Sequence, residues 1–275
     1  MATHTAAGDQ VTLVTCTLGE EGEILLPAIA HLAADQDDRL GSHRIEELAA
    51  SMAALGVSDN RILGGAGKYR DSGMMGEPSN ERPDCFWRAD LREAADALVP
   101  IIREVRPEVL VTYDDFGGYG HPDHIMAHRV AMYASQLAAV AGYRPDLGPA
   151  WEVPRIYWTA FPVSAIRAGI EALRQAGDQS DFAAMDPDDI PFAVPDDAID
   201  AEIDVTGSLD AKIAAMRAHA SQISLEQGFF ALSNNLGAPI FGKEFFRLAK
   251  GRPPRDRPWP DLFAELPPAA DGGPR

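Results

Sequence analysis

The sequence predicts an α/β protein with a Rossmann-like, doubly wound and mostly parallel sheet. Three observations support this class. Apolar, β-rich segments alternate with segments of helical periodicity, each unit about the length of a βα repeat. The apolar segments are nearly uninterrupted, which is typical of strands buried on both faces of a parallel sheet. Three of them end in glycine-rich polar stretches, and ligands bind at this carboxyl edge in such sheets.

The elements follow in order along the chain. The predicted strands are short and rich in β-branched residues; they are Val11–Leu18, Asn60–Gly65, Glu108–Asp115 and Arg155–Phe161. The predicted helices carry apolar residues at helical spacing; they are Gly41–Val57, Asp90–Pro107, His121–Gly142 and Thr206–Ile223. Ser42 and Gly56 suit the start and end of the first helix. Pro122 suits the first turn of the third, and Pro100 should kink or break the second.

One large domain is expected, because 275 residues can bury a sizeable core. It should span residues 1–251 and end in a small α+β elaboration. An acidic excursion without Lys or Arg interrupts it at 175–210, and 190–205 within it reads as two short strands joined by a turn. The tail at 252–275 is rich in Pro and Gly and is predicted to be poorly ordered.

Composition excludes several partners. The net charge of -18 argues against nucleic acid and anionic membranes, which attract basic patches, and suits an uncharged small substrate. The first ten residues do not resemble a signal peptide, and no apolar run is long enough to span a membrane. We therefore expect a cytoplasmic protein. Cys16 and Cys85 do not make a disulfide framework, and Cys16 is predicted to be a buried free thiol. The oligomeric state is not indicated.

The stretch GGYGHPDHIMAH, residues 117–128, holds the most distinctive chemistry. His121 and His124 are three residues apart, so they should share one face of the first helical turn. Asp123 lies between them and can orient a histidine from behind, as carboxylates do for metal-bound imidazoles. His128 can extend the same face. The alternative is an ordinary helix start, with Asp123 as an early acid and His121 on the surface.

This stretch predicts part of a metal site. A catalytic zinc ion takes about three protein ligands and keeps one open position. Two histidines and a carboxylate this close in sequence are not expected to bind one ion together. The other histidine candidates, His4 and His31, do not add a second metal-binding cluster.

Four segments in order along the chain resemble the LmbE-like (PIG-L) zinc deacetylase family. They read VTCTLGEEGE, GGAGKYRDSGM, VTYDDFGGYGHPDH and ALSNNLGAPI. More narrowly, they are similar to the actinobacterial branch that removes the acetyl group of N-acetylglucosaminyl-inositol in mycothiol biosynthesis. A mycothiol S-conjugate amidase usually has a GGERGD-like segment where this chain reads LGEEGE, which favours the deacetylase. The resemblance covers nearly all of residues 1–251.

The resemblance implies one Zn²⁺ ion per subunit and assigns the residues around it. His124 matches a zinc ligand of the family. His121 matches a histidine that stabilises charge in the transition state or protonates the leaving amine, and Asp123 matches its carboxylate partner. Tyr119 matches a tyrosine that polarises the amide carbonyl.

The resemblance also implies a binding site for a small amino-sugar linked to inositol. Arg44 and Asp71 match residues that hold sugar and inositol hydroxyls, and Glu23 matches a glutamate at the rim near the metal. A structural alternative exists for Arg44, which can form an ion pair with Glu47 on one helix face.

One family motif does not occur in this sequence. The family's first motif, A-H-P-D-D-E after an N-terminal strand, supplies two zinc ligands and the general base. Residues 1–10 resemble instead the end of the helix that follows it. We therefore expect a start codon placed too late, an inactive chain, and an unpaired edge at residues 11–16. The alternative is a non-catalytic sugar-binding protein that keeps Arg44 and Asp71.

Overall fold

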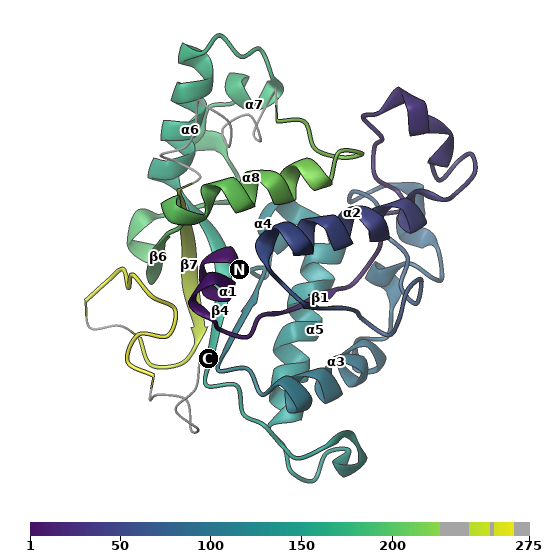
Figure 1. Ribbon diagram of the computed structural model, residues 1–275, viewed down its shortest axis with the longest axis vertical. Helices are drawn as coiled ribbons and strands as arrows, with labels where there is room; N and C mark the ends of the chain where they lie inside the picture. The colour runs from purple at the N-terminus through teal and green to yellow at the C-terminus, as the bar shows by residue number, and fades with distance from the viewer. Residues whose placement is uncertain (226–241, 254–255, 267–275) are drawn as a thin grey trace.

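The computed structural model describes residues 1–225, 242–253 and 256–266, and its strands form two sheets (Figure 1). In the first, β1 (Thr12–Thr15) and β2 (Asp59–Ile62) are parallel. The second contains five strands, which are β3 (Val109–Thr112), β4 (Arg155–Pro162), β5 (Ala193–Val194), β6 (Ala201–Asp204) and β7 (Lys243–Lys250). The segment ALSNNLGAPI, used above for the resemblance, lies outside the described residues.

The four predicted strands are therefore present, and each pairs parallel with one of the others: β1 with β2, and β3 with β4. The C-terminal part is mixed, because β7 runs antiparallel to both β4 and β6. This is the predicted α+β elaboration. In the described structure β1 and β3 do not pair with each other, so the single predicted sheet is interrupted between them. Every residue of β1 is only half-buried, and Val111 of β3 is 44% exposed.

Adjacent residues of β4 point into two apolar clusters on opposite faces of the larger sheet, as strand geometry requires. Ile156 belongs to the first cluster, together with side chains of α3 (Leu91–Val105), α5 (Pro122–Ala138) and both sheets. Tyr157 belongs to the second, which lies among β6, β7 and the C-terminal segment. Since Val14 and Leu110 both pack on the first cluster, side chains join the two sheets where hydrogen bonds do not.

The predicted helices are confirmed to within a few residues at each end; they are α2 (Leu40–Leu55), α3 (Leu91–Val105), α5 (Pro122–Ala138) and α8 (Leu209–Ala218). α2 begins before Ser42, with Arg39 as its N-cap, so Ser42 lies inside the helix. Residues 2–7 form a further short helix, α1 (Ala2–Ala7). The Asp90 carboxylate accepts the Glu93 N–H and caps α3. α3 continues through Pro100, and the buried Val99 and Ile102 beside it hold that segment on the core. None of the helices in the described ranges is long and apolar enough to cross a membrane.

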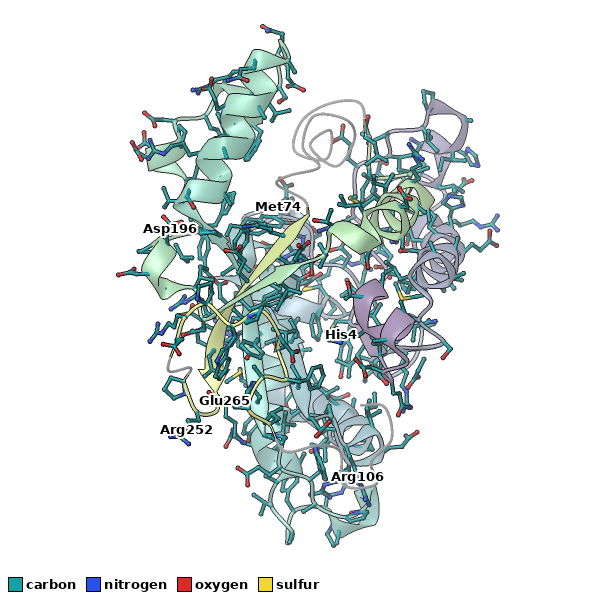
Figure 2. The ribbon with its side chains drawn as sticks, turned by 60° about the vertical axis from the view of Figure 1, so that its left-hand side comes forward. His4, Met74, Arg106, Asp196, Arg252 and Glu265 are labelled. Atoms are coloured by element: carbon teal, nitrogen blue, oxygen red, sulfur yellow. The ribbon has the colours of Figure 1, made fainter. Side chains whose placement is uncertain are left out.

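α6 (Val163–Gln175), which stands above Asp196 in Figure 2, leads into the acidic excursion. The excursion itself folds into α7 (Asp181–Ala184), short turns and short strands. Its two predicted strands exist as β5 and β6, but they pair with different neighbours, β4 and β7. Arg174 fastens α6 to this region by donating to the carbonyl oxygens of Ala183 and Met185.

Residues 256–266 form an ordered segment where the sequence predicts a poorly ordered tail. Trp259 exchanges backbone hydrogen bonds with Asp200 and Glu202, and its side chain enters the second cluster with Leu262. The Arg155 guanidinium lies 4.5 Å from the Trp259 ring centroid. An aromatic anchor thus outweighs the Pro-rich composition. Residues 254–255 and 267–275 lie outside the described residues.

Replacing Trp259 with alanine should release this segment. Removing a buried tryptophan leaves a cavity and unpairs the Arg155 cation from the ring, and such changes cost about 3 kcal/mol. We expect that loss in urea unfolding, together with faster proteolysis between residues 256 and 266. Trp259→Phe should recover most of the stability, and equal proteolysis of both variants would contradict the anchoring role.

Candidate active site

The loops after β1 and β2 meet at a buried carboxylate, Asp71. Its Oδ2 accepts the Glu21 N–H (3.2 Å), and its Oδ1 accepts the Gly73 N–H (3.0 Å). The backbone N–H of Asp71 donates to Oε2 of Glu20 at 3.0 Å. Because Glu20 and Asp71 are both buried, this exchange fixes the two loops against each other at the carboxyl edge of the sheet.

The loop after β3 turns sharply into α5. Gly117 has φ +71, and a Cβ there would lie 2.7 Å from the Ile125 nitrogen, so only glycine fits against the helix start. His121 is the N-cap of α5, and its Nδ1 accepts the Asp123 N–H at 3.1 Å. The rings of His121 and His124 stack with centroids 4.8 Å apart, which confirms the predicted shared face.

His124 is held in a defined tautomer. Its Nδ1 donates to the Gly117 carbonyl oxygen at 3.1 Å, which leaves Nε2 as the acceptor. The Tyr113 ring stacks on the other face of the imidazole, 4.1 Å between centroids. Burial, assisted by the neighbouring His121, lowers the pKa of His124 to about 4. The ring is therefore neutral at physiological pH, the form in which imidazole binds a metal.

The Asp123 carboxylate does not face a histidine. Both of its oxygens accept hydrogen bonds from Ser72, one from the backbone N–H at 3.0 Å and one from the hydroxyl. Asp71 is the carboxylate near His121, with 4.0 Å between Oδ1 and Nε2. Burial raises the pKa of Asp123 to about 8, and Asp71 adds to the effect. Ser72 thus ties the start of α5 to the Asp71 loop.

Two further side chains of residues 117–128, those of Tyr119 and His128, point in different directions. Tyr119 is half exposed and presents its edge to both His121 and His124, at centroid distances of 6.2 and 5.1 Å. His128 turns away from them: its Nδ1 donates to the Tyr113 carbonyl oxygen, and its ring contacts Trp158. His128 therefore does not extend the His121–His124 pair.

Arg44 reaches the same region from α2. Burial lowers the pKa of its guanidinium, against the raising influence of Glu47, Asp71 and Glu20. Its Nη1 donates to Oε1 of Gln222 at 3.3 Å, and its Nε is 4.0 Å from Glu47, so the predicted ion pair is present at its outer limit.

Glu23 is exposed, and the contact that ties it to the site is its backbone carbonyl, which accepts from the Gln222 amide. Most of the predicted site residues thus come together around the start of α5; they are His121, His124, Tyr119, Asp123 and Asp71. Arg44 lies near Asp71.

Comparison with known proteins decides the family. Residues 1–135 match the PIG-L family, described as GlcNAc-PI de-N-acetylase. A 1D-myo-inositol 2-acetamido-2-deoxy-alpha-D-glucopyranoside deacetylase of Kribbella flavida is 58% identical, over 97% of this chain and 91% of that one. A protein of the same name from Geodermatophilus obscurus is 57% identical, over 97% and 92%. The chain belongs to the PIG-L family. It is thus a member of a family of deacetylases, which are hydrolases.

Solved structures support the PIG-L fold. The N,N'-diacetylchitobiose deacetylase of Pyrococcus horikoshii matches with a TM-score of 0.58 and 18% identity, over 98% of this chain and 80% of that one. The 4-carboxy-2-hydroxymuconate hydratase of Pseudomonas putida matches with a TM-score of 0.54 and 20% identity, over 93% and 90%. Since a hydratase shares the architecture, the fold alone does not determine the reaction.

The described residues of this PIG-L chain offer one nitrogen suited to a metal ion. Nε2 of His124 is an acceptor on a neutral ring, which fits one zinc ligand. In the described part of the chain, however, no group of three or more His, Cys, Asp or Glu side chains is placed to hold a metal ion. These residues therefore do not form a complete catalytic zinc site, which takes about three protein ligands.

Three further residues shape this site; the sequence did not indicate Glu20 or Ser72, and it indicated Glu47 only as an ion-pair partner of Arg44. Each is buried and bonds to a partner on another element. Glu20 and Ser72 lie inside the segments LGEEGE and YRDSG, so their neighbourhood was visible in the sequence. Their partners, about fifty residues away, were not.

Proposed function

We propose that this chain is built to deacetylate N-acetylglucosaminyl-inositol, releasing acetate and the free amino sugar in mycothiol biosynthesis. The observation that carries the proposal is the extent of the likeness: relatives so named align with 97% of the chain at up to 58% identity. The gathering of His121, Asp71 and Arg44 at one edge of the sheet supports it, because a hydrogen-bond donor for developing charge and groups that bind hydroxyls then lie near one another.

The chain's own residues suggest how the amide bond would be handled. Nδ1 of His121 accepts a backbone hydrogen bond, so Nε2 is the nitrogen that carries a proton. That atom faces Asp71, whose negative charge favours the imidazolium, while burial lowers the pKa of His121. With Nδ1 accepting, the ring is neutral, so its Nε2–H would stabilise the charge that develops in the transition state by donating a hydrogen bond. The hydroxyl of the half-exposed Tyr119 would donate to the acetyl oxygen as charge develops there.

We further propose that zinc is the metal, that His124 is the ligand this sequence supplies, and that the sequence as it stands has little activity. The A-H-P-D-D-E motif of the family, with two further ligands and the base, does not occur in it. Acetate release from N-acetylglucosaminyl-inositol in the presence of zinc tests this. We expect near-background release from the present chain and strong release after a strand bearing the motif is placed before Met1. Strong release from the present chain would overturn the proposal, as would none from the extended one.

A second function is a sugar-binding protein without turnover, because the described residues do not form a complete metal site. Arg44 and Asp71 are independent of the metal, so binding of the intact sugar can survive without chemistry. Calorimetry with the uncleaved sugar separates the two functions. Binding by both chains but acetate release by neither would favour the binding protein.

Arg44→Ala and Asp71→Ala should weaken binding of the inositol-linked sugar by about tenfold each, the effect of losing one good polar contact. Binding of plain N-acetylglucosamine should change much less, since these residues are assigned to the outer hydroxyls. Titration of both sugars against both variants measures this. Equal losses for the two sugars would rule out recognition of the inositol side.

A further inference from the structure

A buried carboxylate on α2 joins two distant parts of the chain behind the sugar-binding residues. Glu47 is 7% exposed and accepts two hydrogen bonds from Ser221, which is fully buried after the end of α8. The Ser221 N–H lies 2.8 Å from Oε1 of Glu47, and the Ser221 hydroxyl lies 2.7 Å from Oε2. α2 and α8 pack side by side, so this contact closes one end of the helix pair (Figure 1).

The segment held by Glu47 is also bonded to the loop that follows β1. The Leu25 N–H donates to the Ser221 carbonyl oxygen at 2.8 Å. The Gln222 amide donates to the Glu23 carbonyl oxygen and accepts from Nη1 of Arg44. Ser221 and Gln222 therefore contact both α2, through Glu47 and Arg44, and the loop after β1.

Arg44 depends on this junction for its orientation. Its guanidinium passes so close to Gly19 that a Cβ there would lie 1.9 Å from Nη1, which limits the paths open to the side chain. Its Nε is buried and has no hydrogen-bond partner in the described structure, and Nδ1 of His219 nearby is in the same condition. A buried donor without a hydrogen-bond partner is unfavourable, and a neighbouring negative charge offsets part of that cost. Glu47, 4.0 Å from that Nε, is the carboxylate on the same helix.

We propose that Glu47 is a positioning residue for sugar recognition: it does not contact the sugar, but it fixes the Arg44 guanidinium and the Ser221–Gln222 junction in register. This deepens the proposed function and rests on it, because Arg44 is taken to meet the inositol side of the substrate. A purely structural role would give a different result. Loss of a residue that only stabilises the fold would weaken binding of all ligands alike, whereas loss of a positioning residue would weaken binding of the ligands that contact Arg44.

Binding measurements on the full chain distinguish these roles. Glu47→Gln keeps an acceptor for the Ser221 N–H and removes the charge facing Arg44. It should weaken binding of the inositol-linked sugar about tenfold, with less than about a twofold change for N-acetylglucosamine. The double variant with Arg44→Ala should bind no worse than Arg44→Ala alone, because both changes remove one interaction. Glu46→Gln, on the exposed side of the same helix, is the matched control and should bind like the parent.

Fully additive losses in the double variant, or equal losses for both sugars, would overturn the proposal. A second measurement needs no sugar. The Nε–H resonance of Arg44 in ¹⁵N-edited spectra, assigned with Arg44→Lys, should shift in Glu47→Gln and stay unchanged in Glu46→Gln. An unchanged resonance in Glu47→Gln would also overturn it. If neither sugar binds the parent chain, the proposed function fails, while this resonance still decides whether Glu47 positions Arg44.

Discussion

Replacing His124 with alanine in a chain extended by the A-H-P-D-D-E motif is expected to abolish both zinc retention and acetate release. His124 presents an unprotonated Nε2 because its Nδ1 is bonded to Gly117 and because burial lowers its pKa. Losing one of about three ligands removes the affinity that a catalytic zinc site needs. Zinc content after dialysis, measured by atomic emission, and acetate release are the two readouts.

His121→Ala is the matched control in the same extended chain. It should keep zinc and lose turnover by about a hundredfold or more, the usual size of the contribution of one hydrogen-bond donor to developing charge. The structure gives the reason for the difference: Nδ1 of His121 is occupied by its own helix start, and Nε2 faces Asp71. Loss of zinc from His121→Ala, with retention in His124→Ala, would reverse the two assignments.

Arg103→Met is expected to produce the largest loss of stability in the chain, about 4 kcal/mol by the scale of disrupted buried charge networks. Arg103 lies on α3, is 2% exposed and donates to backbone carbonyls only, at 2.8 to 3.4 Å. The six acceptors are the carbonyl oxygens of Leu137, Ala138, Val140, Tyr143, Arg144 and Gly148. They belong to the end of α5 and the loop after it. The last carbonyl groups of a helix have no donor within the helix and form the negative end of its dipole, so a cation is favoured there.

Urea unfolding measures the effect of Arg103→Met. Arg217→Met, at an exposed position of α8, is the control and should change the free energy of unfolding by less than about 0.5 kcal/mol. Arg103→Lys should recover only part of the loss, because an ammonium cannot reach six acceptors arranged around a planar fork. Full recovery by lysine would show that charge alone, without the fork geometry, stabilises the loop.

The local parts of this structure were predictable from the sequence, and the distant contacts were not. The spacing of His121 and His124 fixes their shared face through helix geometry alone, and the structure agrees. The same reasoning fails for Asp123, because a carboxylate beside two histidines in sequence turns instead to Ser72, 51 residues away. The contact between Glu47 and Ser221, 174 residues apart, could not be predicted from the sequence.

Two further differences have physical causes. Composition predicts disorder after Arg252, but one tryptophan that fills an apolar cluster is enough to order residues 256–266. The alternation of strands and helices predicts one sheet, yet alternation does not specify which strands share hydrogen bonds. Pairing depends on neighbours in space, so the interruption between β1 and β3 became visible only in three dimensions.

That interruption has a consequence for how the molecule opens. β1 and β2 are bonded to each other, and they meet the rest of the protein through side chains such as Val14 in the first apolar cluster. A hydrogen-bonded ladder resists shear along its whole length, whereas a side-chain contact gives way once water enters. β1 and β2 can therefore open together while β3, β4 and β7 stay intact. Native-state hydrogen exchange should find two tiers of amide protection, with the lower opening free energy in β1 and β2.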